Sequence, residues 1–429
     1  MFQPPRGTRD FLPDEMYKRN WVLDKIRSVF EAYGYEPLGT PAFESWDMLK
    51  VKSGEDVINQ IYYFRDKSDR ELGLRFEWTT SLIRVISSHR ELPKPFKRYA
   101  IGPVCRYEKP SEKRFREFYQ ADVDIVGVSD PVADTEILAV AVDCFKKIGF
   151  DGFVIKLNDR RLLEDIVESS GISVSDPLEV FRIIDKIEKI GESGVRKELE
   201  KIGATNDSIN NILELTSKKG KPELILEEAR MILAQNEKGV NAIDTLASIV
   251  AYASNYGIAS SIQIDLGLAR GLDYYTGPVF EILAKGYEDY GSIAGGGRYD
   301  KVVELYGGEP TPMTGIALGI ERIVPLLEKK GAFSNVDLGI ETFVVSVSEG
   351  VLPKAIEIVQ TLRRAGIPTD FDHLKRNMSK QLNLANRKGV KVAVIVGERE
   401  LAEGVVTLRN METREQRKVK LENLIEEFR

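Results

Sequence analysis

The sequence is poor in the residue types on which many catalytic and metal sites depend. Only two of its 429 residues are histidine, His89 and His373, and only two are cysteine, Cys105 and Cys144. This scarcity excludes a multi-histidine metal site and argues against a disulfide scaffold or a cysteine-rich zinc site. Because His89 closes a helical pattern and His373 lies in a loop-like stretch, we expect a helix-end or solvated histidine at each position rather than a general base.

Three features that define other large classes of protein are also missing. The sequence has no run of about 18 apolar residues, which a transmembrane helix requires. Its start, MFQPPRGTRDF, lacks the basic segment and apolar stretch of a secretory signal. It contains neither a G-x-x-x-x-G-K-[ST] phosphate loop nor a G-x-G-x-x-G fingerprint. We therefore expect a cytoplasmic protein with no membrane partner and no P-loop nucleotide site.

Length and charge indicate several domains and an uneven surface. At about 150 residues per domain, the 429 residues suggest two to four domains. The net charge is −6, yet Lys94–Arg116 holds eight Lys and Arg against two Glu, and Thr361–Lys420 holds fourteen against seven Asp and Glu. Two basic regions on an acidic chain could contact phosphates, although either one alone would be read as a solvated face.

Hydrophobic periodicity divides the chain into segments of different type. A helix is predicted from about Asp14 to Tyr33, ending at Gly34, and extended residues follow through Pro41. A mixed block reaches about Gly152, and a charged, aromatic-poor helical stretch from about Leu162 to Ala253 indicates a separate insertion. Strands are then predicted at SIQIDLGL and PVFEIL, and TGIALGIERIVPLLEKK begins with small residues and turns into a helix.

The last hundred residues alternate between strand and helix patterns. After KKGAFSNVD, a plausible linker, come the strand FVVSV, the helices LPKAIEIVQTLRRAG and SKQLNLANRKG, and the buried strand VAVIVG. This alternation predicts a small α/β domain.

The segment LARGLDYYTGPVFE concentrates hydrogen-bonding groups between glycines. It carries one guanidinium, Arg270, one carboxylate, Asp273, and two phenols, Tyr274 and Tyr275. Burying these groups unpaired would cost several kcal/mol, so a segment that only fills a core would not contain them. The segment therefore indicates a ligand site.

Four arginines could bind phosphate groups without a P-loop. Arg106 and Arg114 flank a polar loop, EKPSEK, between two strand-like segments, and Arg322 follows a glycine at a helix start. Together with Arg270 they could clamp phosphate oxygens by bidentate hydrogen bonds. A surface salt bridge is the alternative for any single one of them.

Polar residues interrupt two otherwise apolar stretches. Glu77 and Thr79 lie in LRFEWTTSLI, and Gln120, Asp122 and Asp124 share one face of a predicted strand in FYQADVDIVG. That face must point at water or a ligand, and a carboxylate with a phenol could fix an imidazole ring by its two nitrogens. The residues alone thus predict a polar ligand site beside a phosphate clamp.

Six segments resemble those of the histidyl-tRNA synthetase family, which belongs to the class II aminoacyl-tRNA synthetases. RGTRDFLPDE resembles the family's opening, GYEPLGTPAFES its dimerisation element (motif 1), GPVCRYEKPSEKRFREF motif 2 and GIALGIERIV motif 3. RGLDYYTG and AGGGRYD resemble the two histidine-specific peptides. The resemblance covers nearly the whole chain apart from most of the helical stretch.

The resemblance implies an α+β fold, with an antiparallel-sheet catalytic domain, a helical insertion and a C-terminal α/β anticodon-binding domain. The expected boundaries are residues 1–160 and 256–330 for the two parts of the catalytic domain, 161–255 for the insertion and 337–429 for the anticodon-binding domain. The implied activity is ATP-dependent ligation of L-histidine to its tRNA through a histidyl adenylate. Implied partners are ATP as substrate, Mg²⁺ bridging phosphate oxygens, the acceptor end and anticodon of histidine tRNA, and a second copy of the chain.

The resemblance also assigns roles to individual residues, with no metal held by side chains. Histidine would be bound by Glu77, Thr79 and Gln120 at its amino group and by Asp124 and Tyr275 at its imidazole, with Tyr274 beside them. ATP would be bound by Arg106 at the α-phosphate, Glu108 near adenine, and Arg114 and Arg322 at the outer phosphates. Arg106 and Arg270 would contact both histidine and the α-phosphate as the catalytic groups. No protein nucleophile is needed, because the substrate carboxylate attacks.

The sequence departs from the family pattern at one segment, and two functions other than histidine ligation are open. Many family members read LRPE where this chain has LRFE, so Phe76 replaces a proline and Trp78 follows. A synthetase-like regulatory subunit of histidine biosynthesis would lack the C-terminal domain and tend to lose the arginines, whereas this chain retains both. A class II ligase for proline or threonine would lack RGLDYYTG and AGGGRYD.

Overall fold

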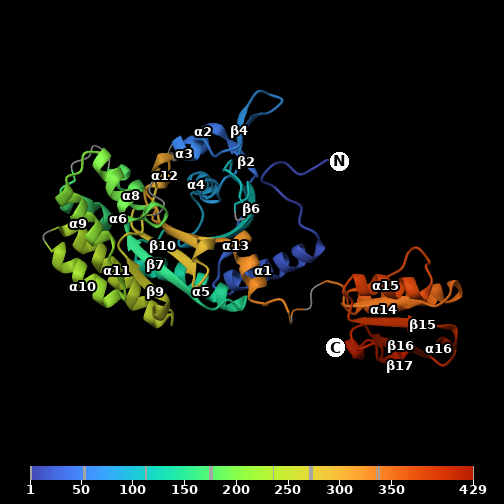
Figure 1. The fold of residues 1–429 in the computed structure, drawn as a ribbon. Helices are drawn as coiled ribbons and strands as arrows, with labels where there is room; N and C mark the ends of the chain where they lie inside the picture. Colours follow the sequence, from blue (N-terminus) through green and yellow to red (C-terminus); the bar gives the residue numbers. More distant parts are fainter. Residues whose placement is uncertain are drawn as a thin grey trace. The chain divides into compact units, whose positions relative to one another are not determined.

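The computed structural model describes residues 2–51, 55–111, 114–172, 177–234, 236–269, 274–334, 336 and 339–428. The chain divides into two units (Figure 1). Unit 1 comprises Met1–Asp10 and Arg19–Ala332, and unit 2 comprises Phe11–Lys18 and Phe333–Arg429. The four-part division expected from the sequence stays a prediction, because the helical segment is grouped with unit 1.

Unit 1 is built on a nine-stranded sheet in the order β1-β5-β6-β12-β11-β10-β7-β9-β8. Every neighbouring pair from β5 to β7 in this order is antiparallel, which confirms the predicted antiparallel sheet. The strands are β1 (Glu36–Pro37), β5 (Phe96–Cys105), β6 (Glu117–Val126), β7 (Phe153–Asp159), β8 (Lys219–Gly220), β9 (Ile262–Asp265), β10 (Pro278–Ala284), β11 (Ser292–Arg298) and β12 (Met313–Gly319).

The longest pairing in this sheet is the hairpin of β5 and β6. The two strands pair without a shift from Phe96 opposite Val126 to Cys105 opposite Glu117. The polar loop predicted between two strands is therefore the tip of this hairpin, and it carries Arg106 at its start. The hairpin thus joins the predicted phosphate-binding residues to the polar face of β6.

Two helices show how sequence patterns predict elements of the fold. The first helix, predicted at Asp14–Tyr33, is α1 (Pro13–Ala32), and Gly34 follows with a φ of 77°, a left-handed conformation that glycine adopts without strain. Helix α5 (Pro131–Lys147) has eleven of its seventeen residues buried. It is covered on both sides because it packs on β6, β11 and β12 and also on α11.

The charged, aromatic-poor stretch forms helices, as predicted, and they gather on one side of the sheet (Figure 1). Apart from the short β8, its elements are α6 (Arg160–Ser169), α7 (Pro177–Ile184), α8 (Ile187–Lys201), α9 (Asn206–Thr216), α10 (Pro222–Ile232) and α11 (Glu237–Asn255). The remaining elements of unit 1 are a small sheet, β2 (Phe43–Ser45), β4 (Glu71–Leu74) and β3 (Tyr63–Arg65), the helices α2 (Trp46–Lys50), α3 (Glu55–Ile58), α4 (Thr79–Ser88), α12 (Val302–Leu305) and α13 (Ile320–Lys329), and the 3₁₀ turns η1 (Ala259–Ser261) and η2 (Glu288–Tyr290).

Unit 2 is a five-stranded sheet in the order β14-β13-β15-β16-β17, with helices on its two faces. The strands are β13 (Thr342–Ser346), β14 (Thr369–Phe371), β15 (Val392–Val396), β16 (Val405–Asn410) and β17 (Gln416–Lys420), and the helices and turns are η3 (Glu349–Val351), α14 (Leu352–Arg364), α15 (Met378–Arg387), α16 (Glu398–Ala402), η4 (Leu421–Asn423) and η5 (Glu426–Phe428). The predicted strand–helix alternation is confirmed. Part of the predicted linker lies outside the described residues.

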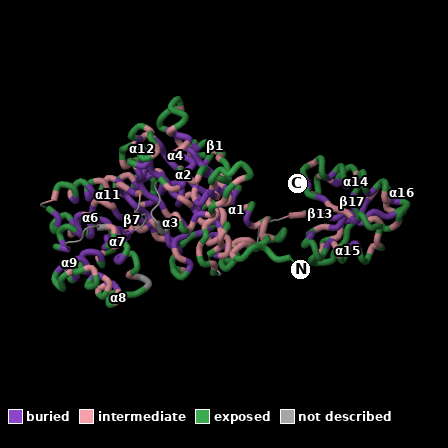
Figure 2. Tube along the Cα trace, turned by 90° about the horizontal axis from the view of Figure 1, so that it is seen from above, coloured by how far each residue is buried: buried purple, intermediate pink, exposed green. Residues whose placement is uncertain are grey.

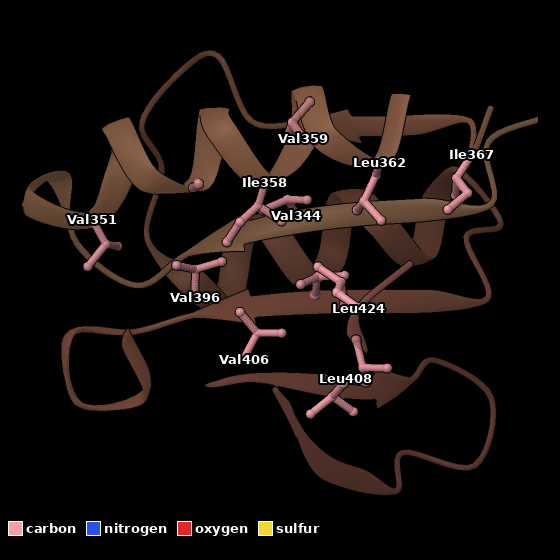
Figure 3. Close-up of a cluster of buried hydrophobic side chains, with 13 residues drawn as sticks. Val344, Val351, Ile358, Val359, Leu362, Ile367, Val396, Val406, Leu408 and Leu424 are labelled. Carbon is pink, nitrogen blue, oxygen red and sulfur yellow. The ribbon is translucent and has the colours of Figure 1, made fainter. Parts of the chain in front are cut away.

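Alternate residues of β13 pack into two separate cores of unit 2. Val344 packs with Ile358 and Leu362 of α14 on one face of the sheet (Figure 3), and Phe343 and Val345 pack on the other. Both cores contain residues of unit 2 alone. Buried residues likewise lie inside each unit, beneath exposed outer faces (Figure 2). Of the helices described, none has both the length and the apolar character that crossing a bilayer would need.

Candidate active site

A cavity of about 450 Å³ lies in unit 1 against the β6 and β12 part of the large sheet. All the described residues that the sequence singled out for the site line this cavity: Glu77, Thr79, Arg106, Glu108, Arg114, Gln120, Asp124, Tyr274, Tyr275 and Arg322. They come from segments more than two hundred residues apart in the chain. Arg270 and Asp273 lie outside the described residues, and the role of each residue at the site stays a prediction.

The floor of the cavity is polar on β6 and nearly free of side chains on its neighbour. Gln120, Asp122 and Asp124 line the cavity, as their spacing on one strand face predicted. Directly opposite them on β12 stand Gly319, Ala317 and Gly315. Because cross-strand partners share a face of the sheet, these small residues leave the space above β6 open to a ligand.

Gly315 is required for the position of the Asp124 carboxylate. A Cβ at Gly315 would lie 2.0 Å from Asp124 Oδ1 and 2.8 Å from the Val123 carbonyl oxygen. Two glycines of AGGGRYD are likewise needed because their neighbours leave no room for a side chain. A Cβ at Gly296 would lie 2.0 Å from the Gly315 carbonyl oxygen, and a Cβ at Gly297 would lie 3.0 Å from the Tyr275 ring. Two glycine-rich segments thus fit closely around one carboxylate and one phenol.

Gly315→Ala is expected to weaken binding of the ligand, which the sequence resemblance predicts to be histidine, at least tenfold. The added methyl group must displace the Asp124 carboxylate, and a charge-assisted hydrogen bond is worth about 1.5–3 kcal/mol. The dissociation constant, measured by calorimetry, provides the test. Gly39→Ala is the matched control, since a Cβ there meets nothing within 4 Å. Equal affinity in both variants would show that the Asp124 position is not critical.

Asp124 is held in place by two buried neighbours. Arg98 Nη2 lies 2.5 Å from Asp124 Oδ2, and the Tyr299 hydroxyl donates to Oδ1. Burial raises the pKa of Tyr299 well above its usual value, so this phenol remains a proton donor. Neither partner was predicted from the sequence, although Arg98 faces Asp124 in the β5–β6 register and Tyr299 belongs to AGGGRYD.

Three tyrosines form an aromatic wall at the Asp124 end. The rings of Tyr274 and Tyr275 have centroids 4.4 Å apart, and both lie within 6.4 Å of the Tyr299 ring. The Tyr274 hydroxyl donates to the Tyr275 hydroxyl at 3.2 Å. Burial raises the pKa of Tyr274 well above its usual value, so it too stays neutral. The wall can enclose a flat polar ring and offer it hydroxyl groups.

Arginines and carboxylates define the opposite end of the cavity. Arg106 Nε donates to the Phe76 carbonyl at 3.0 Å, which fixes the guanidinium while its terminal nitrogens remain as donors. Arg322 Nη1 donates to the Ser292 carbonyl at 2.5 Å. Arg114 is more exposed, and it pairs with Glu108 at 3.4 Å. A guanidinium has five donors, so Arg106, held through Nε, is suited to bind an anion at this end of the cavity.

The start of α13, where Arg322 lies, is tied to the rest of unit 1 by Glu321. This buried carboxylate accepts from the Tyr119 backbone N–H at 2.8 Å and from Arg19. Burial raises the pKa of Glu321, while the Arg19 guanidinium opposes that shift. Glu321 lines the cavity and was not singled out from the sequence; its place directly before Arg322 was the available signal.

The departure at Phe76 and Trp78 is accommodated by packing. Phe76 is 6% exposed in a cluster with Leu49 and Ile61, and Trp78 stacks on the Arg75 guanidinium at 3.5 Å. Glu77 between them still lines the cavity, where its Oε1 accepts from the Thr80 hydroxyl at 2.8 Å. Hydrophobic and cation–π contacts therefore hold this segment without the proline.

An open antiparallel sheet, a long hairpin with an arginine at its tip, and a strand leading into a helix that bears a second arginine define a class II aminoacyl-tRNA synthetase. Residues 7–323 match the family model described as histidyl-tRNA synthetase, and residues 341–429 match the anticodon binding domain. The chain belongs to the histidyl-tRNA synthetase family.

Individual relatives agree along the whole chain. A histidine–tRNA ligase of Pyrococcus furiosus is 40% identical over 427 residues, which cover 99% of this chain and 98% of the relative. The crystal structure of histidyl-tRNA synthetase from Nostoc sp. PCC 7120 is 32% identical with a TM-score of 0.88, covering 100% of this chain and 98% of that one. A Bacillus halodurans structure titled as an ATP phosphoribosyltransferase regulatory subunit/histidyl-tRNA synthetase has a TM-score of 0.78 at 22% identity, covering 92% of this chain and 98% of that one, and shares the fold alone.

Proposed function

We propose that this chain activates L-histidine with ATP and transfers the histidyl group to its tRNA. The observation that carries the proposal is one cavity with a carboxylate and tyrosines at one end and arginines at the other. Full-length similarity to histidine–tRNA ligases and the presence of both family domains support it over the regulatory-subunit alternative. We further propose that the chain works in the cytoplasm.

In this proposal the amino acid lies along the face of β6. Glu77, Thr79 and Gln120 bind its amino group, and Asp124 and Tyr275 bind the two imidazole nitrogens, with Tyr274 completing the wall. Asp124 suits this role because the Arg98 guanidinium pairs with its carboxylate and fixes its position, and hydrogen bonds to carboxylates are among the stronger ones. The carboxylate of the substrate then points towards the arginine end of the cavity.

The nucleotide occupies the arginine end. Arg106 binds the α-phosphate, Arg114 and Arg322 bind the outer phosphates, and Glu108 lies near adenine. The substrate carboxylate attacks the α-phosphorus, a carboxyl–phosphate bond forms, and pyrophosphate leaves, so positioning and charge stabilisation suffice. Cys105, although close by in sequence, is no nucleophile, because burial raises the pKa of its thiol to about 11.

Magnesium is proposed to enter with ATP rather than to occupy a protein-made cage. Within the described ranges, no group of three or more His, Cys, Asp and Glu side chains could hold a metal ion. The two carboxylates at the arginine end are already engaged, Glu108 by Arg114 and Glu321 by Arg19. Mg²⁺ usually keeps several waters and binds substrate phosphates, where it neutralises charge.

A second copy of the chain is the proposed structural partner. The small sheet near the motif 1 segment exposes aromatic side chains, with Phe43 50% and Tyr63 44% exposed. Tyr63 also stacks edge-on against Trp46, at 4.9 Å between ring centroids. Apolar surface of this kind is suited to cover the same surface on another copy.

Asp124→Asn is expected to raise the KM for histidine about 10- to 100-fold in tRNA charging, because it removes a charged acceptor of nearly the same shape. The KM for ATP is the internal control, since the arginine end is unchanged. A variant with a normal histidine KM would show that Asp124 does not bind the substrate. A parallel rise in both constants would indicate lost folding instead.

The salt dependence of tRNA binding should distinguish exposed from paired basic residues in unit 2. Lys380 and Arg387 are exposed, whereas Arg376 pairs with Asp372 and Lys388 with Asp370. Replacing Lys380 or Arg387 with alanine is expected to lower the log–log slope of affinity against salt by about 0.7–0.9 for each phosphate that the variant no longer neutralises. Replacing a paired residue should change the slope less, and the reverse ranking would contradict this assignment.

A further inference from the structure

Asp122 is a buried carboxylate of the cavity with an unused acceptor. It is 5% exposed, and no described residue donates a hydrogen bond to its Oδ1. Its cross-strand neighbours are Ala317 on β12 and Ala100 on β5, whose methyl groups cannot donate. Gln120, two residues earlier on the same face, also has a buried oxygen, Oε1, to which no described residue donates.

Unpartnered buried acceptors are rare, because the loss of hydration is not offset. Two of them side by side in a cavity therefore indicate a ligand that donates. The charges around Asp122 indicate what kind of ligand this is. Arg98 and Arg106 lower the pKa of Asp122, whereas Asp124 and Glu77 raise it, and Arg98 already pairs with Asp124 at 2.5 Å. These three carboxylates therefore face only two guanidiniums, and a cationic ligand would balance the remaining charge. Burial raises the pKa of Asp122 well above its usual value, which a cationic ligand would reverse.

The position of Asp122 selects one part of the amino acid. The Tyr299 hydroxyl and Arg98 meet at Asp124, and the aromatic wall adjoins that end, so the ring belongs there. Two residues along a strand span about 7 Å, so Asp122 lies midway between Asp124 at the ring end and Gln120 at the other end. Since the ring nitrogens are bound at Asp124, the next donor of the amino acid along this face is its amino group.

We propose that Asp122 binds the α-ammonium of the substrate, adding a second carboxylate to the amino-group site of Glu77, Thr79 and Gln120. An ammonium has three N–H donors, and the oxygens of Asp122 and Gln120 are two acceptors to which no described residue donates. The inference rests on the proposed function, since it takes the cavity's ligand to be histidine. Asp122 is then a residue that selects for the charged amino group.

The test compares two ligands that differ only at that group. L-Histidine and imidazolelactate, in which a hydroxyl replaces the ammonium, are bound to the full-length chain and followed by calorimetry. Asp122→Asn is expected to weaken histidine binding by about 10- to 100-fold, the range for removing a hydrogen bond to a charged group, and to leave imidazolelactate binding nearly unchanged. Asp165→Asn, which alters another buried carboxylate on α6 outside the cavity, should change neither.

Each other outcome overturns the inference. If Asp122→Asn weakened the binding of both ligands equally, Asp122 would contact the ring. If it weakened the binding of neither, Asp122 would not contact the substrate. The midpoint of thermal unfolding without ligand supplies a second readout. Asp122→Asn should leave it nearly unchanged, because the amide has almost the same shape as the carboxyl group and Asp122 accepts no hydrogen bond at Oδ1 from a described residue, and a clear fall would mark Asp122 as a structural anchor. Failure of the unaltered chain to bind histidine would count against the proposed function instead.

Discussion

A chain ending at Ala332 is expected to form histidyl adenylate at close to the full rate and to charge histidine tRNA only poorly. The cavity and its lining residues belong to unit 1, whereas the cores of unit 2 are built from unit 2 alone. Adenylate formation needs only the cavity, but the family reads the anticodon with the C-terminal domain. ATP–pyrophosphate exchange and tRNA charging, measured on the same preparations, report the two steps separately.

One control is needed because Phe11–Lys18 is grouped with unit 2 and would lose its packing. The thermal unfolding of the truncated chain should therefore be compared with that of the full chain before activities are interpreted. Truncated protein that charges tRNA as well as the full chain would contradict the anticodon role. A full-length chain that forms no adenylate would instead favour the regulatory-subunit alternative.

Arg270→Ala is expected to reduce adenylate formation by about 10²- to 10³-fold, the usual effect of removing one preorganised donor from a transition state. Histidine affinity should change much less, because the charge on the α-phosphate develops only during attack. Arg270→Lys should rescue poorly, since an ammonium lacks the planar fork of a guanidinium. Single-turnover adenylate formation and equilibrium histidine binding give the two quantities.

Arg114→Ala is the matched comparison for Arg270. Its side chain is 55% exposed and pairs with Glu108, so a smaller loss, mainly in the KM for ATP, is expected. Near-normal turnover of Arg270→Ala would assign Arg270 a structural role. Arg270 lies outside the described residues, so this prediction derives from the resemblance of RGLDYYTG and from the arginines that line the cavity.

The parts of the fold that could be predicted are those encoded by local patterns. The helical period and Gly34 located α1, and the strand–helix alternation after Phe343 located unit 2. The polar face of β6 followed from the spacing of Gln120, Asp122 and Asp124 alone. Each of these depends on residues within a few positions of one another, where backbone geometry fixes which side chains share a face.

The parts that could not be predicted depend on register between distant strands. Nothing near Asp124 in the sequence indicates that Arg98 and Tyr299 hold its carboxylate, or that Gly315 must be small to admit it. Asp122 was placed on the correct face, but its unused oxygen became apparent only with the alanines opposite it. Contacts of this kind depend on which strands pair and on the register between them.

ATP–pyrophosphate exchange with each of the twenty amino acids shows whether this cavity selects histidine. Asp124, Tyr275 and the proposed ammonium site together fit a substrate with an imidazole ring and a free amino group. Strong exchange with histidine alone is the predicted result. Exchange with proline or threonine but not histidine would show that the cavity belongs to a ligase for another amino acid.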